Sequence, residues 1–313
     1  MDLLYLPAAV RSVSASLRID RDGFLLTDAA GGLITYHLAH PASGNAAGFA
    51  AFTGFGKTPY PFDCLRCHAT ASTSLTELGR REDNRPGIDG EWVEEGVQCE
   101  ACHGPGGRHV GNPSAGTIFV ASNSTAVCNH CHSSGTGRLL ARGHFIAGFQ
   151  QADEVAASPH AALDCTTCHD AHVSVFADPQ RAIRNDCQDC HREVNMALHQ
   201  GKVYTRGDYV EPVTCRSCHM PYASMYFRSA AADFADGGMV GDVRSHVMYI
   251  DTQERTFASM FTADGGEVIR DERGKAAVTV DYVCLRCHHG RGSAFELGLR
   301  GASSIAAAIH SVR

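Results

Sequence analysis

One five-residue pattern, Cys-x-x-Cys-His, accounts for every cysteine of this 313-residue chain. It occurs seven times, and together the copies use all 14 cysteines and seven of the 18 histidines. Numbered one to seven along the chain, the motifs have the cysteine pairs Cys64 and Cys67, Cys99 and Cys102, Cys128 and Cys131, Cys165 and Cys168, Cys187 and Cys190, Cys215 and Cys218, and Cys284 and Cys287. The histidines that follow these pairs are His68, His103, His132, His169, His191, His219 and His288.

The motif predicts covalent attachment of haem c. Two thiols form thioether bonds to the two vinyl groups of the haem, and the adjacent histidine lies under the iron as its proximal ligand. Structural zinc sites use sets of four Cys and His ligands and do not require a histidine after every pair. Disulfide frameworks and thioredoxin-like motifs do not require it either. The sequence therefore predicts seven haem c groups.

The histidines outside the motifs are candidates for the second, distal iron ligands. Eleven remain once the seven proximal histidines are subtracted from 18, so the supply exceeds the seven positions. We expect the distal ligands to be His109, His144, His160, His172, His199, His246 and His310. His289 could serve a neighbouring haem, His37 and His40 are held in reserve, and His130, which lies inside motif three, is the weakest candidate.

The spacing of the motifs predicts a multihaem cytochrome fold, in which the porphyrins form much of the core. Residues 64–219 hold six motifs, too little chain for a conventional core, so short helices and loops should wrap the haems. We expect helices over Glu91–Cys102, Arg181–Gln200 and Ser303–Ser311. We expect small β-hairpins near the N-terminus (14–20, 24–27 and 32–38) and at 240–283 (243–251 and 267–283).

Three parts are expected along the chain: a haem-free β-rich arm over residues 1–63, a six-haem region over 64–225, and a C-terminal unit with the seventh haem over 226–313. The composition is that of a globular protein, with 44% apolar and 19% charged residues. A net charge of -7 argues against nucleic acid as a partner. No apolar run reaches the roughly 18 residues of a membrane-spanning helix.

Haem c is attached outside the bacterial cytoplasmic membrane, so we expect an exported protein. The expected location is extracellular or at the cell surface, with the periplasm as the alternative. Residues 1–15 are a poor export signal, because the leading charge is Asp2 and the apolar run is short. The expectation is that the export signal is absent from this chain.

Four segments resemble multihaem cytochromes c: GVQCEACHGPGGRH (96–109), VCNHCHSSG (127–135), HAALDCTTCHDAH (160–172) and VTCRSCHMPY (213–222). They are similar to the superfamily of hydroxylamine oxidoreductase, pentahaem nitrite reductase and the tetrahaem carrier of hydroxylamine oxidation. In style they also resemble extracellular cytochromes, some of which form filaments. The resemblance covers roughly residues 60–310, and it implies ligand roles for His109, His172 and His246.

Departures from these relatives favour electron transfer over catalysis, and no catalytic residue is predicted. The resembled nitrite reductases replace one motif histidine by lysine, whereas all seven motifs here end in histidine. No tyrosine matches the one that hydroxylamine oxidoreductase crosslinks to its haem. Haems with two histidine ligands leave no iron position open, so the expected partners are redox proteins or extracellular electron acceptors. The alternative is a reductase or oxidase of small nitrogen or sulfur compounds with one open haem.

Self-association is a further expectation. Strand edges of the 1–63 arm could join the sheet of a neighbouring copy, and His37 or His40 could ligate a haem there. A head-to-tail contact that does not close generates a filament. The alternative is that the arm packs on the first haem of its own chain.

Overall fold

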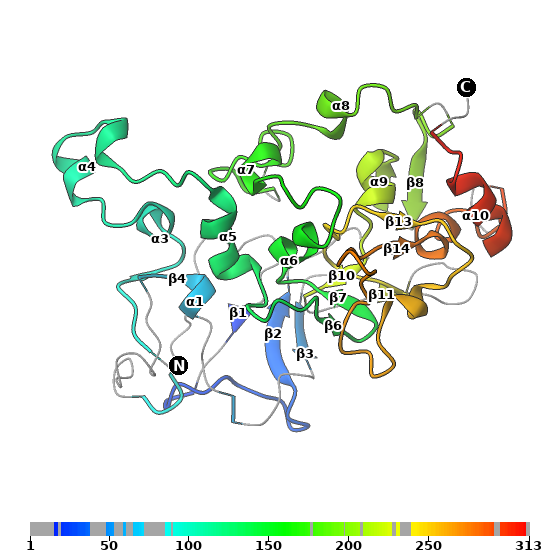
Figure 1. Ribbon diagram of the computed structural model, residues 1–313. Helices are drawn as coiled ribbons and strands as arrows, with labels where there is room; N and C mark the ends of the chain where they lie inside the picture. Colours follow the sequence, from blue (N-terminus) through cyan, green and yellow to red (C-terminus); the bar gives the residue numbers. More distant parts are fainter. Residues whose placement is uncertain are drawn as a thin grey trace. The chain divides into compact units, whose positions relative to one another are not determined.

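The structure is a computed structural model of the 313-residue chain (Figure 1). It describes residues 16–17, 20–37, 48–52, 59–60, 65–71, 85–88, 90–175, 178–196, 198–206, 209–226, 230–231, 239–290 and 295–310. Short helices and small sheets are joined by long loops, as the motif spacing predicts (Figure 1). Among the described helices, none combines the length and the hydropathy that a membrane span requires.

Two compact units interleave along the sequence. Unit 1 consists of Met1–Ala39, Ala46–Cys131 and Asp170–Ala182, and unit 2 of His40–Asn45, His132–His169 and Ile183–Arg313. The boundary divides motif three between Cys131 and His132. This grouping by contacts differs from the three consecutive parts expected above, and those remain a prediction about units that fold on their own.

Unit 1 begins with a three-stranded antiparallel sheet of β1 (Ser16–Leu17), β2 (Leu33–His37) and β3 (Gly48–Phe52), in that order. The register pairs Leu33 with Phe52 and His37 with Gly48. The segment expected as a strand at 24–27 makes only single bridges, at Leu25 and Thr27. The turn before it is held by the Asp20 carboxylate, which accepts backbone hydrogen bonds from Asp22 and Phe24 at 2.9 and 3.0 Å.

The motif helices of unit 1 are short. They are α1 (Leu65–His68) and α3 (Cys99–His103), of about one turn each, and the nine-residue α5 (Ser124–His132), which crosses into unit 2 at its last residue. Between them lie β4 (Ala69–Thr70) paired with β5 (Glu94–Glu95), then α4 (Gly107–Gly111) and the 3₁₀ turn η4 (Ala115–Thr117). The helix expected over Glu91–Cys102 is wrong before Cys99, since Gly96 has a φ of 75° and separates β5 from α3.

Unit 2 contains a second small sheet, in which β7 (Phe145–Ala147) lies between β6 (Ala141–Arg142) and β10 (Ser224–Met225). Its helices are α6 (Gln151–Ala156), α7 (Cys165–Cys168), α8 (Cys187–Cys190), α9 (Cys215–His219) and α10 (Leu299–Ala306). The helix expected over Arg181–Gln200 is wrong outside α8. A capping box at Asp186 starts α8, and the helical geometry ends at His191.

The remaining elements of unit 2 are strand pairs and short helical turns. The pairs are β8 (Val203–Arg206) with β9 (Tyr209–Pro212), β11 (Ala230–Ala231) with β12 (Met239–Val240), and β13 (Ile250–Asp251) with β14 (Val278–Thr279). The turns are the 3₁₀ helix η5 (Phe257–Met260) and the π-helix η6 (Asp281–Leu285). Because β13 and β14 run parallel, the strands expected at 243–251 and 267–283 do not form a hairpin with each other. A short antiparallel bridge between Phe261 and Val268 does lie within 240–283. The expected strand over 243–251 shrinks to β13, since Met248 has a φ of 56° just before it.

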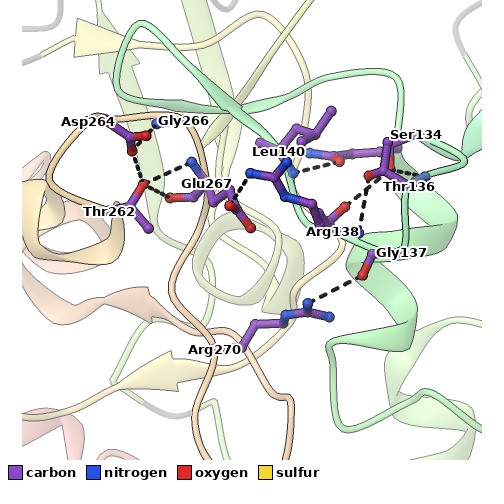
Figure 2. Close-up of polar contacts among 11 residues, drawn as sticks. Ser134, Thr136, Gly137, Arg138, Leu140, Thr262, Asp264, Gly266, Glu267 and Arg270 are labelled. Carbon is purple, nitrogen blue, oxygen red and sulfur yellow. Dashed lines mark hydrogen bonds and ion pairs between the residues drawn. The ribbon is translucent and has the colours of Figure 1, made fainter.

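A polar clamp fixes the start of the 132–169 segment against a turn at 262–270 (Figure 2). Arg138 forms an ion pair with Glu267, and Arg270 donates to the Gly137 carbonyl at 3.3 Å. The buried Gln150 side chain bonds both the N–H of Leu140, at 2.9 Å, and its carbonyl, at 2.5 Å. The apolar core of unit 2 lies beside this clamp and includes Leu139, Phe261 and Val268.

Candidate functional site

Five motif histidines each face a histidine from outside the motifs. In unit 1, the ring centres of His103 and His172 are 6.0 Å apart. In unit 2, the pairs are His160 with His191 at 5.8 Å, His169 with His246 at 6.2 Å, His199 with His288 at 6.2 Å, and His219 with His310 at 5.9 Å. Every one of these pairs combines one predicted proximal ligand with one predicted distal ligand.

The pair geometry fits an iron ion between the two rings. Metal–imidazole bonds are about 2 Å long, so two imidazoles on one ion have their nitrogens about 4 Å and their ring centres about 6 Å apart. The five ring distances lie between 5.8 and 6.2 Å. The Nε2 atoms of His160 and His191 are 3.5 Å apart, so these two nitrogens point at one another.

Hydrogen bonds at Nδ1 orient several of these rings. Backbone carbonyls accept from Nδ1 of His103 (Phe119, 2.6 Å), His219 (Met248, 3.0 Å), His288 (Phe295, 2.9 Å) and His310 (Asn195, 3.2 Å). A carbonyl can only accept, so the proton is on Nδ1 and the lone pair is on Nε2. Such an outer bond fixes both the tautomer and the direction of a metal-binding nitrogen.

Burial favours the neutral form of several of the paired histidines, and the neutral form is the one that binds a metal. Burial, helped by the nearby His169, lowers the pKa of His246 to about 4. It also lowers the pKa of His169 and His219, with smaller contributions from neighbouring histidines. Each of these three imidazoles is therefore neutral at pH 7 and keeps one ring nitrogen with a free lone pair.

The motif cysteines lie where an uncharged sulfur is favoured. Burial, helped by neighbouring cysteines, raises the pKa of Cys187 to about 11 and that of Cys284 to about 12. A thiolate–zinc site would need lowered thiol pKa values, whereas a thioether sulfur carries no charge. Within the part of the chain that the structure describes, no three His, Cys, Asp or Glu side chains converge as metal ligands.

Large apolar side chains beside the paired histidines are exposed, which suits contact with a porphyrin face. Phe295, whose ring centre is 4.7 Å from that of His288, is 65% exposed. The Leu198 side chain, next to His199, is 45% exposed. The Phe119 side chain is 60% exposed, and the backbone carbonyl of Phe119 accepts the hydrogen bond from His103 Nδ1. The donor set, the ring spacing and these apolar surfaces together fit haem.

Other predicted site residues lie elsewhere. The His109 Nδ1 is 3.2 Å from both the Ser114 carbonyl and the Thr117 hydroxyl, and the His144 ring meets the edge of Phe261 at 6.4 Å. Neither contacts a second histidine ring among the described residues. The His132 Nδ1 lies 3.0 Å from the Gln151 side-chain oxygen. Cys64 and His40 lie outside the described residues, so their roles stay predictions.

The sequence analysis does not identify two of the buried charged residues, Glu154 and Arg286. The Glu154 carboxylate is fully buried and accepts hydrogen bonds from the backbone N–H of His246 at 2.7 Å and from the Ser224 hydroxyl at 3.2 Å. Burial raises the pKa of Glu154 to about 7, although these hydrogen bonds oppose the shift. Arg286 is 7% exposed inside motif seven. No sequence signal separates Arg286 from Arg66, because motifs one and seven are the same pentapeptide, CLRCH.

Comparison with known proteins gives partial matches to multihaem cytochromes. A family model described as cytochrome c554 and c-prime matches residues 54–104, which hold motifs one and two. Dissimilatory sulfite reductase MccA of Wolinella succinogenes is 24% identical over 258 residues, covering 62% of this chain and 33% of that protein. Multiheme cytochrome MtrA of Shewanella baltica is 26% identical over 177 residues, covering 52% of this chain and 46% of that protein. The matches thus span less than half of each relative.

Solved structures with a similar course of chain have low TM-scores. The outer cell wall cytochrome OcwA gives a TM-score of 0.49 at 16% identity, covering 96% of this chain and 73% of OcwA. The octahaem MccA gives 0.42 at 20% identity, covering 71% of this chain and 40% of MccA. Likenesses this weak add nothing to the sequence matches. The narrower resemblance to the hydroxylamine oxidoreductase superfamily stays a prediction.

Proposed function

We propose that this multihaem c-type cytochrome transfers electrons through haems whose irons are each held between two histidines. The observation that carries the proposal is the set of five ring pairs, each joining a motif histidine to a distant one. Naming haems by motif, the ligand pairs are His103 and His172 for the second, His169 and His246 for the fourth, His191 and His160 for the fifth, His219 and His310 for the sixth, and His288 and His199 for the seventh. With both axial positions filled, the haem supplies one-electron chemistry without binding a substrate.

The order of motifs in unit 2 supports a route for the electrons. Besides burial, the nearby Cys190 raises the pKa of Cys168, which places motif five beside motif four. In the same way Cys215 acts on Cys187, and Cys218 acts on Cys284. These influences support neighbouring positions for consecutive motifs from four to seven. In this proposal, electrons move between the fourth and seventh haems through the fifth and sixth.

Motifs one and three are close together in unit 1. The Cys67 sulfur lies 3.8 Å from the Cys131 carbonyl, and the Cys131 sulfur lies 3.7 Å from the Arg66 carbonyl. The first and third haems are thus attached to adjoining turns of chain. This contact supports electron exchange between them.

The decisive experiment combines haem counting with a ligand substitution. The intact mass of the mature protein should exceed that of the polypeptide by seven haems. His246→Ala should then turn one low-spin haem high-spin, as seen by electron paramagnetic resonance (EPR). His130→Ala is the matched control, since His130 lies inside a motif and its side chain belongs to no ring pair. Fewer than seven haems, or unchanged spectra for His246→Ala, would count against the proposal.

A second candidate function is reduction of small sulfur or nitrogen oxyanions at one open haem. The match to a protein named dissimilatory sulfite reductase favours it. His132 also faces no second histidine ring among the described residues, so the third haem is the candidate for an iron with an open axial position. A high-spin ferric signal that shifts on adding sulfite or nitrite would support this function. Its absence in fully loaded protein would exclude it.

The proposed haem attachment also bears on the location and assembly of the protein. Because haem c is attached outside the cytoplasmic membrane, the protein acts at the cell surface or outside the cell, with the periplasm as the alternative. Its β3 is an edge strand of the described sheet, with Phe49 58% exposed, and offers pairing to a second copy. Electron microscopy of the intact chain and of a chain lacking residues 1–45 tests head-to-tail assembly. If the intact protein is a monomer at all concentrations, head-to-tail assembly into a filament is ruled out.

A further inference from the structure

A guanidinium group is buried between the attachment sites of the sixth and seventh haems. Arg286 lies between Cys284 and Cys287, and it donates through Nη2 to the carbonyl of Ser217 in motif six. The helical turns that carry the two motifs, α9 and η6, pack against each other. The Nε atom of Arg286 is buried and has no hydrogen-bond partner. Arg286 therefore places a positive charge, largely shielded from water, between these two motifs.

A carboxylate that acts on Arg286 is shared with a second guanidinium group. Glu211 lies within electrostatic reach of Arg286, pairs with Arg244 at 2.6 Å and accepts from the Ser217 hydroxyl at 2.8 Å. One carboxylate thus serves two guanidinium groups, and this trio keeps a net charge of +1. The Arg286 guanidinium also lies 5.9 Å from the Tyr204 ring centre, a contact that tolerates a cation.

The chemistry of haem attachment keeps the propionates away from Arg286. The vinyl groups that react with the cysteines lie on one edge of the porphyrin, and the propionates lie on the opposite edge. Arg286 sits among the cysteines of motif seven and contacts the turn of motif six. Haems held by these cysteines would therefore present their thioether edges to Arg286, and their propionates would lie on the far edges.

We propose that Arg286 raises the reduction potentials of the sixth and seventh haems above the values that they would have without its buried charge. This inference rests on the proposed electron-transfer function. Reduction removes one positive charge from the iron centre, so a nearby fixed cation favours the reduced state. In a poorly hydrated interior this effect is much stronger than at the surface. The sixth and seventh haems are then reduced more readily than they would be without this buried charge.

The test compares two substitutions of Arg286 with a matched control. Arg286→Gln removes the charge and Arg286→Lys keeps it. The control, Arg66→Gln, changes the same position of the same pentapeptide, but Arg66 is exposed and donates to the His130 carbonyl at 2.9 Å. Haem content is measured first by intact mass, and the midpoint potentials are then measured by an EPR-monitored redox titration.

Arg286→Gln should make two of the seven haems about tenfold harder to reduce, or about 59 mV for a one-electron couple. Arg286→Lys and Arg66→Gln should leave all potentials close to those of the unchanged protein. Equal effects of the Gln and Lys variants, or a uniform shift of all haems, would overturn the inference. A protein with seven haems but unshifted potentials would overturn only this inference, whereas missing haems in the unchanged protein would overturn the proposed function itself.

A second variant provides the test if the Arg286→Gln protein fails to incorporate its sixth or seventh haem. Glu211→Gln keeps the hydrogen bonds near Ser217 and Arg244 but removes the compensating negative charge. Glu211→Gln should raise the reduction potentials of the same two haems, whereas Arg286→Gln lowers them. Unchanged or lowered potentials in Glu211→Gln would contradict the inference.

Discussion

His160 and His191 are 31 residues apart in the sequence, yet their Nε2 atoms lie 3.5 Å apart, with the rings nearly perpendicular at 83°. Burial, together with the nearby His191, lowers the pKa of His160, so its imidazole is neutral near pH 7. An approach of 3.5 Å between two Nε2 atoms fits an N–H···N hydrogen bond in one tautomer and two lone pairs on a shared metal ion in the other. In the second tautomer the metal ion holds the two rings together. The pair is therefore informative about the cofactor as well as about the fold.

The angles between paired rings predict distinct EPR signals. Perpendicular axial imidazoles give ferric haems a large maximal g value, and near-parallel ones give an ordinary rhombic spectrum. The fifth and seventh haems, with angles of 83° and 82°, should belong to the first class. The second and sixth, at 6° and 17°, should belong to the second class. Low-temperature EPR of the oxidised protein checks this, and a spectrum with a single class of signal would contradict it.

Two truncations test His310. Removing residues 310–313 should make the sixth haem high-spin, because His219 then loses the ring that faces it at 5.9 Å. Removing residues 311–313 keeps His310 and should leave the spectrum unchanged. The EPR spin state of the two purified proteins, each with seven haems by mass, is the measurement. Identical spectra would remove His310 from the ligand set.

Glu154 should make stability depend on pH. Burial raises the pKa of Glu154 from 4.5 to about 7, so the folded protein holds this proton more tightly than the unfolded chain. Stability should therefore fall as the pH rises from about 4.5 through about 7, by up to about 3 kcal/mol from this group. Glu154→Gln should abolish that component and stabilise the protein above pH 7.

Denaturant unfolding of the loaded protein at pH 5 and pH 8 measures the effect. Glu267→Gln is the control, because Glu267 is a surface carboxylate whose pKa is lowered by its hydrogen bond with Arg138. It should leave the loss of stability between pH 5 and pH 8 in place. An equal pH dependence in Glu154→Gln and the unchanged protein would show that the carboxylate is solvated.

The polar clamp of Figure 2 should depend on Gln150 more than on Arg138. Gln150→Ala leaves the N–H of Leu140 without its partner, whereas the Leu140 carbonyl keeps its hydrogen bond from the Ala147 N–H at 3.0 Å, so the substitution should cost about 2 kcal/mol. Arg138 lies at the surface, so Arg138→Ala should change the unfolding midpoint little. Denaturant unfolding of both variants at one pH gives the comparison. A larger loss for Arg138→Ala would reverse this ranking.

The sequence alone locates the motifs, but it cannot decide which histidines meet. The helix expected over Arg181–Gln200 would place His199 about two turns beyond His191. Among the described residues no helix continues past α8, and the His199 ring lies against His288 of motif seven instead. His144, also expected as a distal ligand, adopts a φ of 62° and its ring meets Phe261. These outcomes depend on loops, whose course is set by long-range packing and not by local periodicity.

Local patterns also overestimate regular structure in this chain. Residues 243–251 alternate like a strand, yet only Ile250–Asp251 pair with β14. The alternation has another cause, since Val243 and Val247 are buried in the core and His246 turns toward His169. The burial of Arg286 and the exposure of Arg66 make the same point. Identical pentapeptides acquire different surroundings only through the fold.

The pairing of His219 with His310 has a consequence for the making of the protein. A chain that is synthesised and exported from its N-terminus presents the sixth motif well before it presents residue 310. With the proposed ligands, the haem joined to the sixth motif lacks its distal histidine until residue 310 has been exported. The same delay holds for the haem of His103, whose distal ligand is His172. The number of low-spin haems should therefore rise stepwise during maturation, as each distal histidine becomes available.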